Sequence, residues 1–204
     1  MIAIVDYGLG NIRAFSNMYK RMNIDTQIVT RADELRSTSK VILPGVGAFD
    51  HAMALLQASG MRETLDELVL RRKVPVLGIC VGMQILAEGS DEGQLPGLGW
   101  IAGRVRAFKS VPQSAGLPLP HMGWNDVQPI AGLRLFDGLE TDARFYFLHS
   151  YFFECAQADG TAATAAYGID FSCAVRSDNV YGVQFHPEKS HHYGAQLLKN
   201  FAEL

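Results

Sequence analysis

The sequence has few cysteines, no excess of basic residues and no long apolar run. Its three cysteines, Cys80, Cys155 and Cys173, are an odd number without a Cys-x-x-Cys pair, so no disulfide framework is expected. The 18 basic residues are outnumbered by 21 acidic ones, which argues against a nucleic-acid-binding protein. The longest uncharged apolar stretch, 74–87, contains one proline and two glycines and is too short to span a membrane.

The composition predicts a folded protein with a core of its own. Of the 204 residues, 48% are apolar and 19% are charged, and we find no repeat, low-complexity tract or linker. We therefore expect one domain over 1–204, large enough to need neither a disulfide nor a structural metal. The opening segment, Met1 to Asp6, has no basic leader and reaches an acidic residue early. We expect no signal peptide and a location in the reducing cytoplasm.

The first half alternates short apolar runs with segments of helical periodicity. Asn11 precedes a helical stripe and is expected to cap it, and further stripes begin at Phe49 and at Leu65. This order predicts an α/β fold, with an open, mostly parallel sheet flanked by helices and joined by right-handed crossovers. The expected strands are 2–5, 26–29, 41–43, which ends at Pro44 and Gly45, and 74–79, which is apolar on both faces.

The second half is richer in strands than in helices. Segments 97–108, 123–130 and 144–153 are expected to add antiparallel strands to the same sheet, and the proline-rich segment 110–120 to form a surface loop. A core strand over 180–185 and a last helix capped by Ser190 complete the prediction.

Cys80 stands in the segment Gly78-Ile79-Cys80-Val81-Gly82, between the most apolar strand and a helix that is expected to run through Leu86. This is a nucleophile-elbow pattern with cysteine in place of serine. Its glycines allow a sharp turn, and the helix N-terminus favours a thiolate. The alternative is a buried core cysteine, which is how we interpret Cys155 and Cys173.

His186 and Glu188 follow the strand expected over 180–185. A histidine at a strand end can reach a neighbouring cysteine as acid and base. If the chain stays extended near Pro187, Glu188 points the same way and orients the imidazole. The alternatives are a helix start, or a metal site that includes His191 and His192, although the spacing is not that of a metal-binding motif.

Two glycine-rich turns also lie at predicted strand ends. The loop 44–49 can present backbone N–H groups to an anion, and one of them could form an oxyanion hole with the N–H of Val81, unless it is an ordinary turn. The loop 8–13 begins like a dinucleotide-binding turn, but Arg13 stands at the third glycine and Thr30 where an acidic residue is needed. We therefore expect no cofactor and no metal.

Taken together, these motifs resemble the class I glutamine amidotransferases, which carry a catalytic triad. Within that class the chain is most similar to the glutaminase subunits of imidazole glycerol phosphate synthases. The flavodoxin-like fold of the class agrees with the fold predicted above. The matching segments are Ile4-Val5-Asp6-Tyr7-Gly8-Leu9-Gly10-Asn11, Leu43-Pro44-Gly45-Val46-Gly47-Ala48-Phe49, Gly78-Ile79-Cys80-Val81-Gly82-Met83-Gln84, Gly97-Leu98-Gly99-Trp100, Pro120-His121-Met122-Gly123-Trp124-Asn125, Phe147-Leu148-His149-Ser150-Tyr151 and Tyr181-Gly182-Val183-Gln184-Phe185-His186-Pro187-Glu188-Lys189-Ser190.

The resemblance implies a function and a role for each matching residue. The chain would hydrolyse L-glutamine and pass ammonia to a cyclase subunit that is a (β/α)8 barrel, in histidine biosynthesis. Val81 stands where the family more often has leucine, and segment 110–120 differs from shorter relatives, but neither departure affects the triad. The implied residues are Cys80, His186 and Glu188 for catalysis, Val46, Gly47 and Val81 for the oxyanion hole, Gln84, His149, Ser150 and Tyr151 for substrate binding, and Asn11, Trp124 and Lys189 for the partner interface.

Two other functions fit the same residues. One is a free-standing cysteine hydrolase on this fold, which would turn over its substrate without a second protein. The other is a non-catalytic α/β binding module with an inert Cys80, which would react slowly with alkylating reagents below pH 7.

Overall fold

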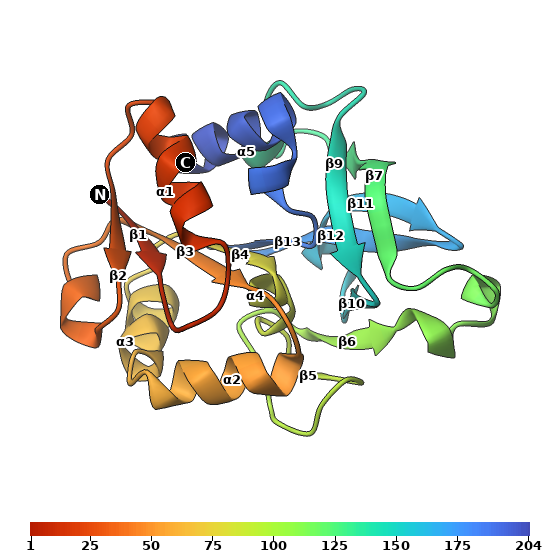
Figure 1. Cartoon of the computed structure of the whole chain (residues 1–204), viewed down its shortest axis with the longest axis horizontal. Coiled ribbons are helices and arrows are strands. Elements are labelled where there is room, and N and C mark those ends of the chain that lie inside the picture. The colour runs from red at the N-terminus through yellow and green to blue at the C-terminus, as the bar shows by residue number, and fades with distance from the viewer.

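The computed structural model describes all residues from Met1 to Leu204. Four short apolar segments of the first half form adjacent parallel strands (Figure 1). Every residue of the first and the fourth is buried, as expected for strands covered on both faces. These strands are β1 (Ile2–Val5), β2 (Thr26–Val29), β3 (Lys40–Gly45) and β4 (Val76–Cys80).

Later strands extend this sheet to eleven. They are β5 (Gly89–Ser90), β6 (Gly103–Ala107), β8 (Gln128–Pro129), β10 (Tyr151–Cys155), β11 (Thr161–Tyr167), β12 (Ile169–Ser177) and β13 (Val180–Val183). The order is β2-β1-β3-β4-β13-β12-β10-β6-β5, and β11 and β8 continue from β12. Neighbours are parallel from β2 to β13, whereas β12, β10, β6 and β11 are joined antiparallel. The predicted open α/β sheet with antiparallel additions is confirmed.

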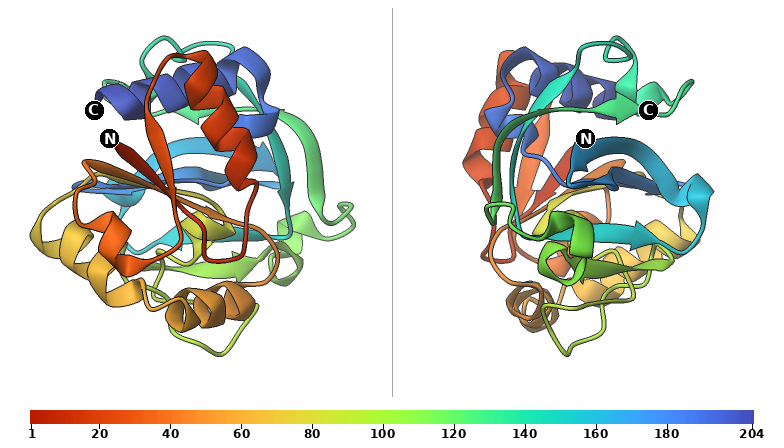
Figure 2. Two further views of the ribbon diagram at one scale, coloured as in Figure 1. Left: turned by 60° about the vertical axis from the view of Figure 1, so that its left-hand side comes forward. Right: turned by 90° about the vertical axis from the view of Figure 1, so that its right-hand side faces the viewer.

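Helices cover both faces of the parallel strands (Figure 2). Helices α1 (Ile12–Arg21) and α5 (His191–Glu203) lie on one face, and α2 (Phe49–Ala58) and α3 (Arg62–Asp66) lie on the other. Helix α3 continues directly into a π-helical turn, Glu67–Arg71. None of these helices has the length and apolar character that a membrane crossing requires.

Strand β4 spans Val76–Cys80 rather than the predicted 74–79, and two further details of this region differ from the prediction. Asn11 precedes α1, but its side chain makes no capping hydrogen bond. Strand β3 does not end at Pro44 but runs through it to Gly45, pairing with β4. The proline is tolerated because β1 pairs with β3 only as far as Ile42, so the N–H that Pro44 lacks is not needed on that side.

The second half departs further from the prediction. Segments 123–130 and 144–153 do not simply join the large sheet, because β7 (His121–Asp126) and β9 (Arg144–His149) form a separate antiparallel pair beside it (Figure 1). The chain changes sheets at Ser150, between β9 and β10. Strands β11 and β12 were not predicted, and within 97–108 only β6 is a strand. Segment 110–120 is an irregular connection with short 3-10 turns.

Candidate active site

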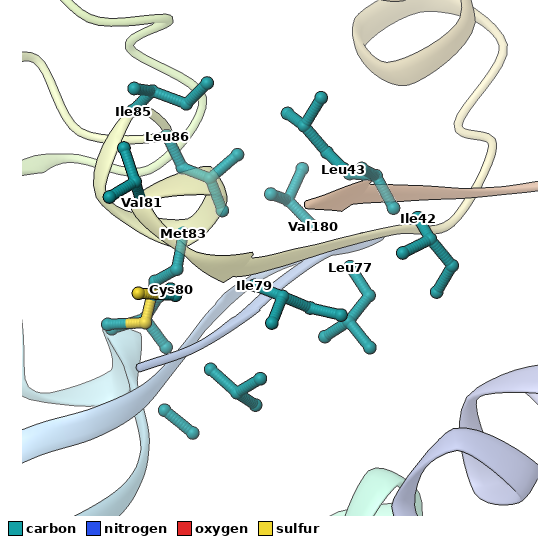
Figure 3. Close-up of a cluster of buried hydrophobic side chains, with 14 of the residues drawn as sticks. Ile42, Leu43, Leu77, Ile79, Cys80, Val81, Met83, Ile85, Leu86 and Val180 are labelled. Carbon is teal, nitrogen blue, oxygen red and sulfur yellow. The ribbon is translucent and has the colours of Figure 1, made fainter. Parts of the chain in front are cut away.

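The elbow expected at Cys80 is present. Cys80 ends β4, and helix α4 (Val81–Gln84) begins directly after it, as Figure 3 shows. Its backbone has φ 56° and ψ −115°, a strained conformation for a residue with a side chain. A Cβ on Gly82 would lie 1.9 Å from the carbonyl oxygen of Leu43. The turn therefore depends on glycine at this position, as the pattern predicted.

The helix after the elbow is shorter than expected. It ends at Gln84 rather than Leu86, because the next carbonyls pair with a later segment of the chain. The carbonyl oxygens of Ile85 and Leu86 accept hydrogen bonds from the N–H groups of Leu98 and Ile101. One helical turn has only a small dipole, so any stabilisation of a thiolate has to come mainly from side chains.

His186 and Glu188 form a buried pair. Strand β13 ends at Val183, two residues earlier than expected, and the chain turns as a 3-10 helix over Pro187–Lys189 instead of staying extended. The carboxylate still meets the ring, with Glu188 Oε1 2.9 Å from His186 Nδ1. The two side chains are only 5% and 2% exposed.

The structure brings Cys80 and His186 together. Both residues line one cavity, so the imidazole and the thiol face the same space. Burial alone would lower the pKa of His186, but its interactions with Cys80 and Glu188, including the hydrogen bond to Glu188, raise it to about 9. At neutral pH the imidazole can therefore hold a proton taken from the sulfur.

A cavity of about 280 Å³ opens at the elbow. Gly45 on β3 is the register partner of Cys80 on β4, so the loop after β3 lies beside the start of α4. The cavity brings together every residue predicted for the oxyanion hole and for substrate binding, and also Lys189. Its lining includes Val46, Gly47, Val81, Gln84, His149, Ser150 and Tyr151.

The remaining residues predicted for the partner interface lie outside the cavity. Asn11 is exposed before α1, and Trp124 is 40% exposed on β7. Trp124 stacks on His191, with ring centroids 5.4 Å apart. Lys189 is placed over the ring of Tyr146 at 5.7 Å.

The residues of the alternative metal site do not gather. His191 stacks on Trp124, and His192 packs against Tyr193 at 3.9 Å. Ser190, expected to cap α5, instead joins the site to the second sheet: its hydroxyl donates to the His186 carbonyl at 2.6 Å and accepts from the N–H of Tyr146 at 3.0 Å.

Sequence reasoning missed several residues of the site. Gln184 is fully buried, accepts a hydrogen bond from Gln84 Nε2 at 3.0 Å, and directs its own Nε2 at Cys80 Sγ, 3.7 Å away. Glu92 brings a carboxylate to the cavity, where it accepts from the N–H of Phe49 at 2.9 Å. A buried polar residue beside a catalytic motif is the signal that could have revealed Gln184.

Tyr7 is a further residue that the prediction left without a role. Its hydroxyl is buried without a hydrogen-bond partner. A Cβ on Gly45 would lie 3.0 Å from that oxygen, which places it directly beneath the elbow. Burial, with the nearby charge of Cys80, raises the pKa of Tyr7 far above its ordinary value, so the phenol stays protonated.

The chain is similar to known proteins over nearly its whole length. The sequence profile of the family described as "Glutamine amidotransferase class-I" matches residues 3–204. The imidazole glycerol phosphate synthase subunit HisH of Bdellovibrio bacteriovorus is 66% identical over 204 residues, covering both chains completely. The HisH subunit of Leptospira interrogans is 52% identical with the same coverage.

Solved structures share the fold at lower identity. A crystal structure of a glutamine amidotransferase superposes with a TM-score of 0.77 at 20% identity, covering 99% of this chain and 97% of the other. A putative GMP synthase subunit from Thermoplasma acidophilum gives a TM-score of 0.73 at 22% identity, covering 99% and 92%. At these identities the likeness is one of fold.

Proposed function

Because the chain belongs to the class I glutamine amidotransferase family, we propose that it hydrolyses the side-chain amide of L-glutamine to glutamate and ammonia. The high identity to HisH subunits over the full chain further supports a place in histidine biosynthesis. The observation that carries the proposal is the meeting of Cys80 with the buried His186–Glu188 pair at the cavity. A cysteine that only fills the core would not require a histidine–carboxylate pair in the same cavity.

The first half of the reaction forms a thioester. The sulfur of Cys80 attacks the amide carbon of glutamine while His186 accepts the thiol proton. The imidazole then gives that proton to the departing nitrogen, the C–N bond breaks, and ammonia leaves. Glu188 accepts the Nδ1–H of His186 and keeps Nε2 directed at the sulfur.

The second half restores the enzyme. A water attacks the thioester carbon as His186 takes its proton, and the C–S bond breaks to release glutamate and a protonated thiol. In both halves the carbonyl oxygen becomes negative. We assign its stabilisation to N–H groups of Val46 or Gly47 together with Val81. Gln84 and the segment His149-Ser150-Tyr151 would hold the amino-acid end of glutamine.

We further propose that the ammonia passes to a cyclase subunit with a (β/α)8 barrel. The exposed face of β7 and β9 offers an apolar surface for such a partner, since Met122 is 64%, Trp124 40% and Leu148 36% exposed. Leu148 and Lys189 also line the cavity, so a partner docked there would cover its mouth. Asn11, Trp124 and Lys189 are the residues we assign to this interface.

The test is Cys80→Ala, assayed together with the cyclase subunit. Glutamine-dependent formation of imidazole glycerol phosphate should be abolished, while formation from added ammonia should continue at the wild-type rate. Loss of both activities would contradict the assignment of Cys80 as the glutamine nucleophile. Cys173→Ala is the matched control, because this second buried cysteine lies away from the cavity and should leave both activities intact.

The dependence on a partner is tested separately. The isolated wild-type chain should turn over glutamine slowly, and the cyclase subunit should accelerate it. Equally fast turnover with and without a second protein would instead favour a free-standing hydrolase.

A further inference from the structure

Two buried histidines lie at or beside the cavity and take no part in the proton transfers described above. His121 on β7 and His149 on β9 are register partners in the two-stranded sheet. Nδ1 of His121 is 2.9 Å from Nε2 of His149, and both residues are buried. His149 also contributes to the cavity wall.

The hydrogen bonds around this pair determine where each proton lies. Nδ1 of His149 is 2.7 Å from the carbonyl oxygen of Tyr151, which can only accept, so this nitrogen carries the hydrogen. In a neutral ring Nε2 of His149 then has a free lone pair. The hydrogen shared between the two rings must therefore belong to Nδ1 of His121.

The hydrogen bond between His121 and Asn125, on the far side of the pair from Tyr151, leads to the same assignment. The amide of Asn125 is oriented independently, because its oxygen accepts from the N–H of Asp126 at 2.8 Å and its nitrogen donates to the carbonyl of Ala166 at 2.9 Å. That nitrogen lies 3.3 Å from Nε2 of His121, which must therefore be the acceptor. If His149 were protonated it would donate to His121, whose Nε2–H would then oppose the amide hydrogens of Asn125.

The surroundings also favour neutral rings. His121 lies between the aromatic rings of Phe147 and Tyr167, with centroids 4.9 and 4.1 Å away. His149 packs against Phe108 and Phe171. Burial lowers the pKa of His121 to about 4 and that of His149 to about 3.

We propose that His121 and His149 form a neutral pair of Nδ1–H imidazoles whose role is to position the segment His149-Ser150-Tyr151 in the wall of the glutamine cavity. This role rests on the proposed function, since that segment is assigned to the amino-acid end of glutamine. The segment lies where the chain leaves one sheet for the other, so no continuous strand holds it. The bond from His149 to the Tyr151 carbonyl closes the turn, and His121 holds the ring that makes this bond.

The first test is the spectrum of the wild-type protein, which depends on no variant. With all six histidines labelled with ¹⁵N, NMR should show two rings in the neutral Nδ1–H form from about pH 5 to about pH 8. His121→Asn and His149→Asn should each remove one of these signals. An Nε2–H tautomer at either position, or protonation near the ordinary pKa of 6.5, would overturn the inference whatever the outcome for Cys80.

The second test separates positioning from folding by kinetics. His121→Phe keeps a ring between Phe147 and Tyr167 but removes the donor, and should raise the KM for glutamine about tenfold with a smaller change in kcat. His121→Asn places an N–H near the former Nδ1 and should recover most of the loss. Ammonia-dependent activity with the cyclase subunit should be unchanged in both variants. An unchanged KM in His121→Phe would overturn the positioning role while leaving the proposed reaction intact.

Discussion

The two walls of the cavity are built in different ways. The wall that carries Cys80 is formed by main chain against main chain, where glycines let strand β3 and the start of α4 approach each other closely. The wall that carries His186 is held by side-chain hydrogen bonds: Glu188 bonds the ring of His186, and Ser190 joins the His186 carbonyl to strand β9 of the small sheet. The first wall should therefore be sensitive to added atoms, and the second to the loss of single donors or acceptors.

The largest effect is expected from adding one methyl group to the first wall. In Gly82→Ala the new Cβ would meet the Leu43 carbonyl oxygen, so the elbow must shift, activity with glutamine should vanish and the free energy of unfolding should fall by about 3 kcal/mol. Urea unfolding measures this loss. Gly60→Ala is the control, because the Cβ added at Gly60 would enter open space. Its positive φ should cost only about 1 kcal/mol. Equal stability losses in the two variants would refute the close-packing account of the first wall.

The next effect is expected from the second wall at Glu188→Gln. The amide has almost the size of the carboxylate but removes the charge that orients His186 and stabilises the imidazolium formed when the ring takes the thiol proton. We expect kcat with glutamine to fall by about 10³-fold, while ammonia-dependent activity of the complex persists. Steady-state kinetics of the complex checks this. A variant with near-normal kcat would mean that Glu188 is dispensable for orienting the ring.

A smaller effect is expected at Gln184, where the two walls meet. Gln184→Leu removes the donor to Cys80 and leaves the amide of Gln84 without its acceptor, so we expect a roughly tenfold lower kcat and about 1–2 kcal/mol less stability. Gln184→Glu keeps the acceptor for Gln84 but places a carboxylate near the sulfur. If the donor to the sulfur matters, Gln184→Glu should also have a lower kcat than the wild type, but it should be more stable than Gln184→Leu. Full activity in both variants would show that Gln184 is only a packing residue.

The most gradual effect, spread over several pH units, is a pH dependence of stability that has opposite signs for His186 and for the pair His121 and His149. The pKa of His186 is raised to about 9, so its contribution is complete below the unfolded value of about 6.5 and is lost as the pH rises through 9. The pKa values of His121 and His149 are lowered to about 4 and about 3, so their contribution is present above about 6.5 and is lost as the pH falls. Each slope is at most about 1.4 kcal/mol per pH unit for one histidine.

Urea unfolding at a series of pH values separates these contributions. The stability difference between the wild type and His186→Gln should shrink from pH 6.5 to pH 9. In His121→Asn the free energy of unfolding should fall less steeply below pH 6.5 than it does in the wild type. Parallel curves for the wild type and both variants would contradict the assigned protonation states.

The first wall could be predicted from the sequence because its causes are local. Strand β1 has the predicted bounds, since its four residues are buried on both faces and form a short apolar run. Strand β2 also has the predicted bounds, although two of its four residues are exposed. The glycines on either side of Cys80 indicate a tight turn at fixed spacing. Even there the length of α4 was wrong, because it depends on carbonyls that pair with residues far along the chain.

Much of the second wall could not be predicted, because its causes are long-range. Strand β11 is rich in alanine, which gives no strand signal, and its pairing with β12 and β8 defines it. The pair β7–β9 has the alternation of any half-buried strand, and nothing local indicates that it leaves the main sheet. His121 stands in one of the segments that match the family, but its contact with His149 follows only from the register of β7 and β9.

The most direct test of the central claim is to find which atom attacks glutamine. A glutamine analogue with a diazoketone in place of the side-chain amide should alkylate the nucleophile irreversibly when added to the complex with the cyclase subunit. Mass spectrometry of the digested protein should find one adduct per chain, on Cys80, with none on Cys155 or Cys173, and labelling should be far slower in His186→Ala. Modification of another residue with Cys80 left free, or labelling at an undiminished rate without His186, would contradict the account.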